Sequence, residues 1–275
     1  MPSFIPLPDT PTPDLTTSTL LIPSISLGNI PQLTIDLLIH TFAFVKLGTL
    51  DDLYLYPFAS PQDYATTATT TTTTAVSAQR GIAHAVEVYH CAALRVCLVQ
   101  QRSPILPGCV DNYVTQTVMP FVKASGFKKV VVLDSLDAGV FEHVHAGDIE
   151  VYSSEILLSK SLESLKLSNE TVLENEDEKE KDQHSDYVRC LLREFDLPRG
   201  EASKSDAELN DVDVSVLVSF VYEGDNFYDG EKLADKVIDF LGVEKKAERW
   251  VRPISWFGAY GDKPVPNAME EGLFG

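Results

Sequence analysis

The chain has 275 residues, 44% of them hydrophobic, which is enough to bury a substantial core in one large domain or two small ones. Its 41 acidic and 22 basic residues give a formal net charge of −19, which repels phosphate backbones and anionic membrane surfaces. The composition therefore predicts neither a nucleic-acid partner nor a membrane partner, and it suits a basic protein partner.

The cysteines and the N-terminal residues indicate the compartment. Four cysteines are scattered without a Cys-x-x-Cys pair, which is typical of reduced thiols in a cytoplasmic or nuclear protein: Cys91, Cys97, Cys109 and Cys190. Residues 1–8 have no positive charge ahead of an apolar stretch, and no apolar run approaches the roughly 18 residues of a membrane span. We therefore expect a protein that is neither secreted nor anchored.

The first predicted elements are a strand, a tight turn and a helix. Residues 19–26 form an apolar run of strand length, and Gly28-Asn29 marks the turn. Apolar side chains then recur at helical spacing over residues 30–44, with Asn29 as the expected N-cap. This order is typical of α/β proteins.

The next segments predict strands separated by loops. Gly48 is expected to end the first helical region, and residues 50–58 to form a second strand. The threonine tract at 65–75 offers no large core side chains, so it predicts a loop of low order. Residues 85–91 and 94–100 alternate as two strands joined by a tight turn.

A crossover unit follows. Apolar spacing predicts a helix over 107–125, ended by Gly126 in the C′ position, and residues 128–134 form an apolar strand. A helix that leads into a buried strand is half of a parallel crossover connection. We therefore expect the central sheet to be mostly parallel.

The last third of the chain combines a charged segment with a second crossover. Residues 159–210 are polar and highly charged, which predicts an insertion, except that 187–193 can form a short helix. A buried strand is expected at 213–221, a turn at 223–226 and an amphipathic helix at 229–241. Strands that alternate with helices predict an α/β sheet covered on both faces, a three-layer αβα sandwich.

The predicted organisation is one α/β domain over residues 1–260, with the loop at 65–75 and the insertion at about 159–210 inside it. Trp250 and Trp256 are expected to dock onto the core. Residues 261–275 are expected to form a flexible C-terminal tail.

Two turns could in principle serve an enzyme. Backbone N–H groups at Gly28-Asn29 could bind an anion at a helix N-terminus, but the glycine patterns of dinucleotide and P-loop sites are missing. The acidic turn at 223–226 follows a parallel strand, where α/β active sites often lie, yet it also supplies capping side chains to its own helix. A phosphorylase-like enzyme that acts on a nucleoside or similar small molecule and uses the Gly28-Asn29 turn as an anion site stays as the alternative hypothesis.

The histidines give no metal or catalytic signature. His143, His145 and Asp148 lack the helical spacing of a zinc site, and no Cys/His partner accompanies them. His84 and His90 lie on predicted strands, and no Gly-x-Ser-x-Gly motif presents a serine nucleophile. We predict no catalytic, metal or cofactor site, and no cofactor.

Three segments resemble the PAC2 family of proteasome assembly chaperones. Residues 20–39 contain the pattern Pro-x-x-Ser-x-Gly-Asn-x-x-Gln-Leu within Leu20-Leu-Ile-Pro-Ser-Ile-Ser-Leu-Gly-Asn-Ile-Pro-Gln-Leu33. The others are Leu217-Val-Ser-Phe-Val-Tyr-Glu-Gly-Asp-Asn226 and Trp250-Val-Arg-Pro-Ile-Ser-Trp256. The resemblance implies a three-layer fold related to nucleoside phosphorylases without enzymatic activity. It also implies pairing with proteasome assembly chaperone 1 and binding to the α ring of the 20S proteasome.

The resemblance also gives the tail a role. In this family a tail that ends in a hydrophobic residue, a tyrosine and any residue inserts between α subunits, where its carboxylate meets a lysine. Leu273, Phe274 and Gly275 match in order, with phenylalanine in the place of tyrosine. The ring still fills an apolar slot, while the loss of the hydroxyl's hydrogen bond costs about 0.5–1.5 kcal/mol. These three residues are the predicted partner-binding site for the α-ring pocket.

Overall fold

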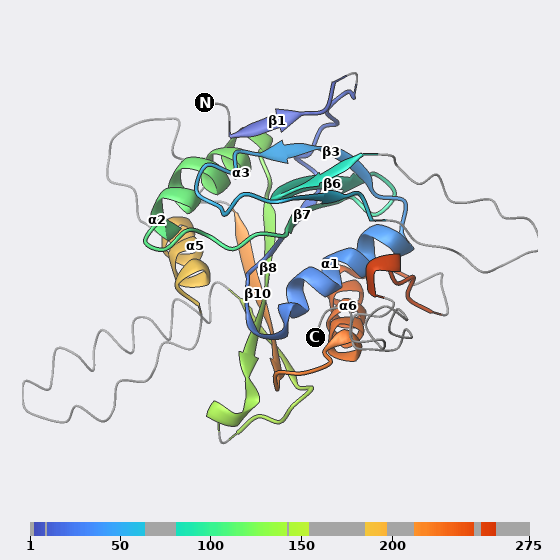
Figure 1. The fold of residues 1–275 in the computed structure, drawn as a ribbon, viewed down its shortest axis with the longest axis vertical. Coiled ribbons are helices and arrows are strands. Elements are labelled where there is room, and N and C mark those ends of the chain that lie inside the picture. The colour runs from blue at the N-terminus through green and yellow to red at the C-terminus, as the bar shows by residue number, and fades with distance from the viewer. Residues whose placement is uncertain are drawn as a thin grey trace, which may run out of the picture.

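An eight-stranded sheet runs through the centre of the computed structural model, which describes residues 3–8, 10–63, 81–141, 143–153, 185–196, 212–244 and 249–256 (Figure 1). From one edge to the other the strands are β1 (Phe4–Pro6), β3 (Val45–Leu50), β6 (Val86–Cys91), β7 (Val96–Gln101), β2 (Thr19–Pro23), β8 (Lys129–Asp137), β10 (Asp213–Val221) and β9 (Ile149–Ser153). Strands β4 (Ala59–Pro61) and β5 (Ile82–His84) form a separate ribbon.

The sheet is mixed rather than mostly parallel. Its four central strands, β7, β2, β8 and β10, are parallel. The strands on both sides pair in antiparallel fashion, because β6 and β7 form a hairpin and β9 returns along β10. The predicted parallel sheet is therefore confirmed at the centre and wrong at the margins.

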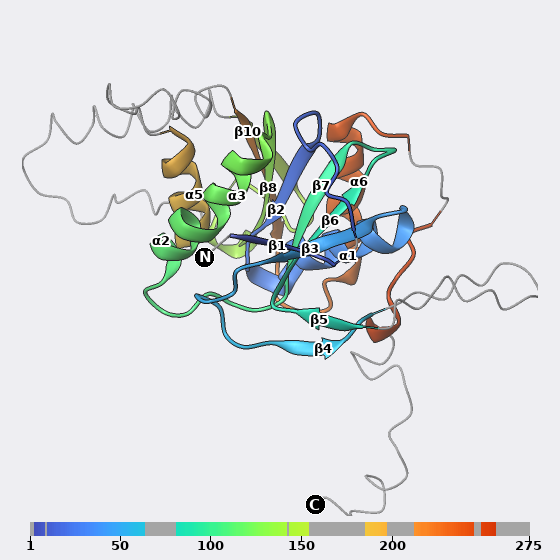
Figure 2. The same ribbon diagram turned by 90° about the horizontal axis from the view of Figure 1, so that it is seen from above.

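Helices cover both faces of the sheet, as the three-layer prediction requires. Helices α1 (Ile30–Thr41) and α6 (Phe227–Leu241) pack together on one face (Figures 1 and 2). On the other face lie α2 (Val110–Tyr113), a π-helical turn over Val114–Val118, α3 (Met119–Ser125) and α5 (Asp186–Asp196). None of the helices among the described residues is long and apolar enough to cross a membrane.

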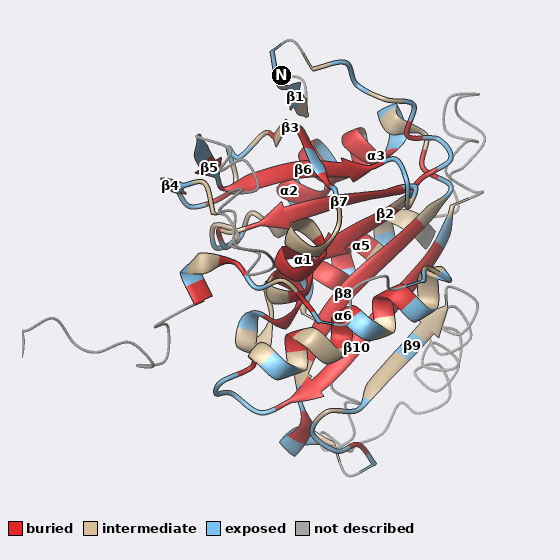
Figure 3. Ribbon diagram, turned by 90° about the vertical axis from the view of Figure 1, so that its right-hand side faces the viewer, coloured by how far each residue is buried: buried red, intermediate tan, exposed pale blue. Residues whose placement is uncertain are grey.

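Alternation along the central strands divides the core between the two layers. In β8, Val130 and Val132 face the α2, α3 and α5 side, whereas Val131 and Leu133 face α1 and α6. Because successive strand residues point to opposite faces, a strand covered on both sides is apolar at most of its positions. Figure 3 shows the central strands buried along their length and β9 only partly buried.

Several predicted elements are confirmed. Strands β6 and β7 form the expected hairpin, and Arg95 adopts a left-handed conformation in its turn, with φ of 53°. Gly126 and Gly242 end α3 and α6 in the left-handed conformation that glycine allows. The helix expected at 187–193 is α5, and its buried side chains join the core beside α2.

The prediction for the segment around Gly48 is wrong. Gly48 does not end a helical region but lies inside β3, and residues 51–58 form no named strand. A Cβ on Gly48 would lie 2.2 Å from the Ile5 carbonyl oxygen. Glycine is therefore needed here because β1 approaches the β3 backbone closely.

The prediction that the Asn29 side chain caps the first helix is also wrong. It precedes α1 in a left-handed conformation, with φ of 51°, and its side chain makes no capping hydrogen bond. The turn before α1 is instead a short 3₁₀ segment over Leu27–Asn29.

Three predicted segments lie outside the described residues. These are the threonine tract at 65–75, the parts of the insertion at 159–184 and 197–210, and the tail at 261–275. The division into a domain over residues 1–260 and a tail stays a prediction.

Candidate functional site

The carboxyl edge of the parallel strands is the first place to look for a site, because open α/β sheets bind ligands there. Ser24 Oγ, just beyond β2, lies 2.6 Å from Asp134 Oδ1 and 2.8 Å from Ser26 Oγ. Ser26 Oγ in turn lies 2.8 Å from Ser135 Oγ, which donates to the Leu27 carbonyl oxygen. These hydroxyls are engaged with one another and with a buried carboxylate, so they form a structural network that joins β2 to β8.

The turn proposed for anion binding packs against another turn. Gly28 has φ of 65°, and a Cβ on it would lie 2.6 Å from Asn226 Oδ1. The Asn226 side chain therefore lies directly against the Gly28-Asn29 turn. This geometry favours packing between the two turns, 27–29 and 223–226, over an anion site.

Buried charges near the same edge are paired. Arg102 Nη2 lies 2.8 Å from Asp36 Oδ1, and Gln100 Nε2 donates to the same oxygen at 2.6 Å. Burial opposes the charge on Arg102, but the ion pair and hydrogen bond with Asp36, together with the nearby Tyr89 and Glu87, outweigh burial and raise the pKa of the guanidinium. Farther along the sheet, Lys46 forms a buried ion pair with Glu87. These pairs join α1 to β7 and β3 to β6.

The predicted histidines occupy separate places. The His145 side chain is exposed and its backbone N–H donates to Asp148 Oδ2 at 2.7 Å, while His143 contacts the ring of Phe141. His90 Nε2 lies 3.1 Å from Ser18 Oγ. Within the described part of the chain, no group of three or more His, Cys, Asp or Glu side chains could hold a metal ion.

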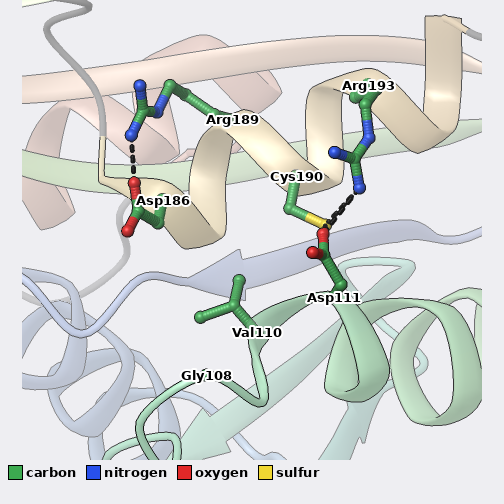
Figure 4. A pocket seen from close by; sticks show the side chains of 7 residues that line it. All are labelled: Gly108, Val110, Asp111, Asp186, Arg189, Cys190 and Arg193. Atoms are coloured by element: carbon green, nitrogen blue, oxygen red, sulfur yellow. Dashed lines mark hydrogen bonds and ion pairs between the residues drawn. The ribbon is translucent and has the colours of Figure 1, made fainter.

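An open cavity of about 560 Å³ separates the start of α2 from α5 (Figure 4), and its lining residues are Gly108, Val110, Asp111, Asp186, Arg189, Cys190 and Arg193. Its charges are balanced, because Arg193 Nη2 lies 2.6 Å from Asp111 Oδ1 and Arg189 pairs with Asp186. Cys190 Sγ donates to Asp111 Oδ1 at 3.1 Å. A lining of matched ion pairs gives no net attraction for a charged ligand.

We expect Cys190 to resist alkylation near pH 8. Burial, with the hydrogen bond to Asp111, raises the pKa of its thiol to about 12, so the reactive thiolate is scarce. Labelling with iodoacetamide, followed by mass spectrometry, should modify Cys190 at least about 10-fold more slowly than the half-exposed Cys109. Equal labelling rates for the two thiols would contradict a protected Cys190.

Most of the large apolar side chains that are exposed lie along the carboxyl edge. Six of the nine large hydrophobic residues exposed among the described residues lie on loops, turns or element ends at this edge: Leu53, Tyr56, Ile82, Val140, Tyr222 and Tyr228. Strand β3 runs in the same direction as β7, so the segment around 53–56 that follows β3 lies at the edge where β7 ends. Strand β6 begins at that edge, so the segment around 82 lies there as well. The turns after β8 and β10 lie at the same edge of the sheet. The part of this edge that carries Val140, Tyr222 and Tyr228 is the candidate partner-binding surface.

The predicted site residues Leu273, Phe274 and Gly275 lie outside the described residues, but the segment that leads to them is placed. Residues 250–256 run along α6, ending in a 3₁₀ turn over Ile254–Trp256. Trp250 and Trp256 are both buried against α1 and α6, which confirms their predicted docking. Figure 2 shows this last turn beside the β4–β5 ribbon, and Ser255 Oγ bonds Asp63 there.

The structure also reveals surface residues that the sequence did not single out. Tyr222 and Tyr228 flank the acidic turn 223–226, and their exposure depends on the packing around them. The sequence signal that could have identified them is the pair of tyrosines on either side of a turn that contains Gly, Asp and Asn.

Comparisons with known proteins agree on one family. A family profile described as "PAC2 family" matches residues 20–180. A Homo sapiens protein named "Proteasome assembly chaperone 2" is 28% identical over 287 residues, covering 96% of this chain and 98% of its own. A Saccharomyces cerevisiae protein of the same name is 27% identical and covers 89% of this chain and 95% of its own.

Solved structures share the fold. Pyrococcus furiosus PbaA, described as an archaeal homologue of proteasome-assembly chaperone, aligns with a TM-score of 0.55 at 14% identity over 86% of each chain. Pyrococcus furiosus PbaB, described as an archaeal proteasome activator, aligns with a TM-score of 0.54 at 15% identity over 89% of this chain and 91% of its own. At these identities the likeness shows the fold alone, and the relation to nucleoside phosphorylases stays a prediction.

Proposed function

Because this chain belongs to the PAC2 family, we propose that it is a chaperone subunit that pairs with proteasome assembly chaperone 1 and binds the α ring of the 20S proteasome during assembly. It prevents off-pathway association of α-ring intermediates in the cytoplasm and the nucleus, and it does so without catalysing a reaction. The observation that carries this proposal is the match to relatives named "Proteasome assembly chaperone 2" along 96% of this chain and 98% of theirs.

The geometry of the carboxyl edge supports binding rather than catalysis. The serine hydroxyls there are engaged with one another and with Asp134, and Asn226 packs against the turn that an anion would need. The same edge carries exposed tyrosines and aliphatic side chains. Exposed apolar clusters with polar surroundings are typical of protein-binding surfaces.

Purification of the tagged full chain from cells tests the pairing and the α-ring contact together. We expect mass spectrometry to identify a second assembly chaperone at equal stoichiometry, together with proteasome α subunits. Recovery of the chain as a monomer, without a second assembly chaperone and without proteasome α subunits, would contradict the proposed function.

Removal of Leu273, Phe274 and Gly275 tests the tail. We expect the heterodimer to remain intact and its affinity for 20S proteasome to fall on the order of 10- to 100-fold, because an apolar anchor and a charge-assisted contact are lost together. Affinity can be measured by surface plasmon resonance on immobilised 20S proteasome.

Phe274→Tyr is the matched variant for the tail. It adds the hydroxyl that Phe274 lacks, so we expect binding to strengthen by roughly 2- to 10-fold, in line with one additional hydrogen bond. If both the deletion and this substitution leave the affinity for the proteasome unchanged, the tail has no part in binding.

A further inference from the structure

The turn between β10 and α6 is held in one conformation by a buried side chain. Asn226 is only 2% exposed, and its Nδ2 donates to the Tyr222 carbonyl oxygen at 2.8 Å and to Asp229 Oδ2 at 3.2 Å. Its Oδ1 accepts a hydrogen bond from the Gly224 backbone N–H. The Asn226 carboxamide also packs against Gly28. We call residues 222–228 the Tyr222–Tyr228 turn.

This rigid turn exposes large aromatic side chains. Tyr222 and Tyr228 are 60% and 64% exposed, although each is next to well-packed residues. A Cβ on Gly139 would lie 3.4 Å from the Tyr222 ring, so this ring lies beside the short turn that carries the exposed Val140. Tyrosine offers a large contact area at low cost in side-chain entropy, which is why it is enriched at binding hot spots.

The charges around the two rings are suited to a basic partner. Asp137, Glu223 and Asp225 are exposed at this end of the sheet. Lys232 Nζ lies 4.7 Å from the centroid of the Tyr228 ring, so one of the two rings already contacts a cation within the protein. Exposed ring faces flanked by carboxylates complement a surface that presents lysine or arginine.

The segment that leads to the tail begins beside this turn. Phe227, within the Tyr222–Tyr228 turn, stacks on Trp256 with ring centroids 4.4 Å apart and planes 4° from parallel. Arg252 pairs with Glu231 of α6 and holds the same segment in place. Residues 257–275 therefore start from the end of the molecule that carries the exposed tyrosines. A segment of that length spans at most roughly 65 Å when fully extended.

We infer that the Tyr222–Tyr228 turn is a second docking element, through which the folded body binds a lysine- or arginine-bearing surface of the proteasome α ring near the tail pocket. This inference rests on the proposed function and names a further contact with the same partner. The tail and the turn then act as two linked contacts, each of which raises the effective concentration of the other.

The double variant Tyr222→Ala/Tyr228→Ala, in the full chain bound to its partner chaperone, tests the docking element. We expect its affinity for purified 20S proteasome to fall on the order of 10- to 100-fold, with an unchanged melting temperature, because the rings are exposed in the free protein. Tyr56→Ala is the matched control, since Tyr56 is a 45% exposed tyrosine beside β3 on the other side of the same edge. It should leave the affinity unchanged.

A charge-reversal variant gives an independent measurement. Glu223→Lys/Asp225→Lys is expected to slow association with the 20S proteasome by about 10-fold at low ionic strength and to weaken its salt dependence. If neither the double tyrosine variant nor the charge-reversal variant changes binding to the 20S proteasome, the turn is not a docking element. The same conclusion follows if Tyr56→Ala lowers the affinity as much as the double tyrosine variant does. Either result leaves the proposed function intact. Failure of the wild-type complex to bind the proteasome would overturn the proposed function itself.

Discussion

Replacement of Glu87 by alanine is expected to lower the free energy of unfolding by about 3–5 kcal/mol, because it leaves a buried lysine without its counter-charge. Glu87 is fully buried and accepts hydrogen bonds from Lys46, from the His84 backbone N–H at 3.1 Å and from the Tyr89 hydroxyl at 2.9 Å. The Lys46 side chain is only 8% exposed. Urea unfolding followed by circular dichroism measures the loss.

The double variant Lys46→Met/Glu87→Gln is the control for this prediction. It removes both charges but keeps a side-chain oxygen that can accept from the His84 N–H or the Tyr89 hydroxyl, so we expect it to recover most of the stability that Glu87→Ala loses. Lys46→Met alone leaves the carboxylate unpaired and should be destabilising as well. If Glu87→Ala unfolds at the same urea concentration as the wild type, the buried Lys46–Glu87 pair contributes nothing to the stability of the protein.

Asn226→Ala is expected to reduce both stability and binding. The substitution removes both hydrogen bonds that the buried Asn226 amide donates, to the Tyr222 carbonyl oxygen and to Asp229, which costs about 1–3 kcal/mol. It also releases the Tyr222–Tyr228 turn, so the two rings must be ordered on binding at an entropic cost. We therefore expect the affinity for 20S proteasome to fall by roughly 10-fold. Thermal unfolding and surface plasmon resonance on the same preparation measure the two effects.

Asn29→Gly is the matched control for Asn226→Ala. Asn29 belongs to the neighbouring turn, but its side chain makes no capping bond and its φ of 51° suits glycine. We expect its stability and its proteasome binding to stay close to those of the wild type. An Asn226→Ala protein that binds as tightly as this control would show that the rigidity of the turn has no role in docking.

The central strands could be predicted because their environment favours apolar residues at most positions on both faces. Runs such as 213–221 are covered by helices on both faces, so continuous hydrophobicity identifies them without knowledge of their neighbours. Helix ends at Gly126 and Gly242 could be predicted for an equally local reason, since glycine allows the left-handed C-terminal residue.

The sheet margin could not be predicted in the same way. β3 contains Lys46 and Gly48, which disfavour a buried strand when they are read alone. Lys46 is tolerated because Glu87 of β6 neutralises it, and Gly48 is needed because β1 lies against it. Both reasons involve residues roughly 40 positions away in the sequence, so no local pattern expresses them.

The candidate binding surface likewise combines features that depend on local sequence with features that depend on packing. The α/β class, the family resemblance and the prediction that Leu273, Phe274 and Gly275 bind a partner came from the amino-acid sequence, because each depends on residue types in a short stretch of chain. The packing of the fold brings the three resembling segments together, through the contact of Gly28 with Asn226 and the stacking of Phe227 on Trp256. Whether a tyrosine is buried or exposed depends on how strands, helices and turns distant in sequence pack around it, and that packing placed Tyr222 and Tyr228 on the surface beside the start of the tail.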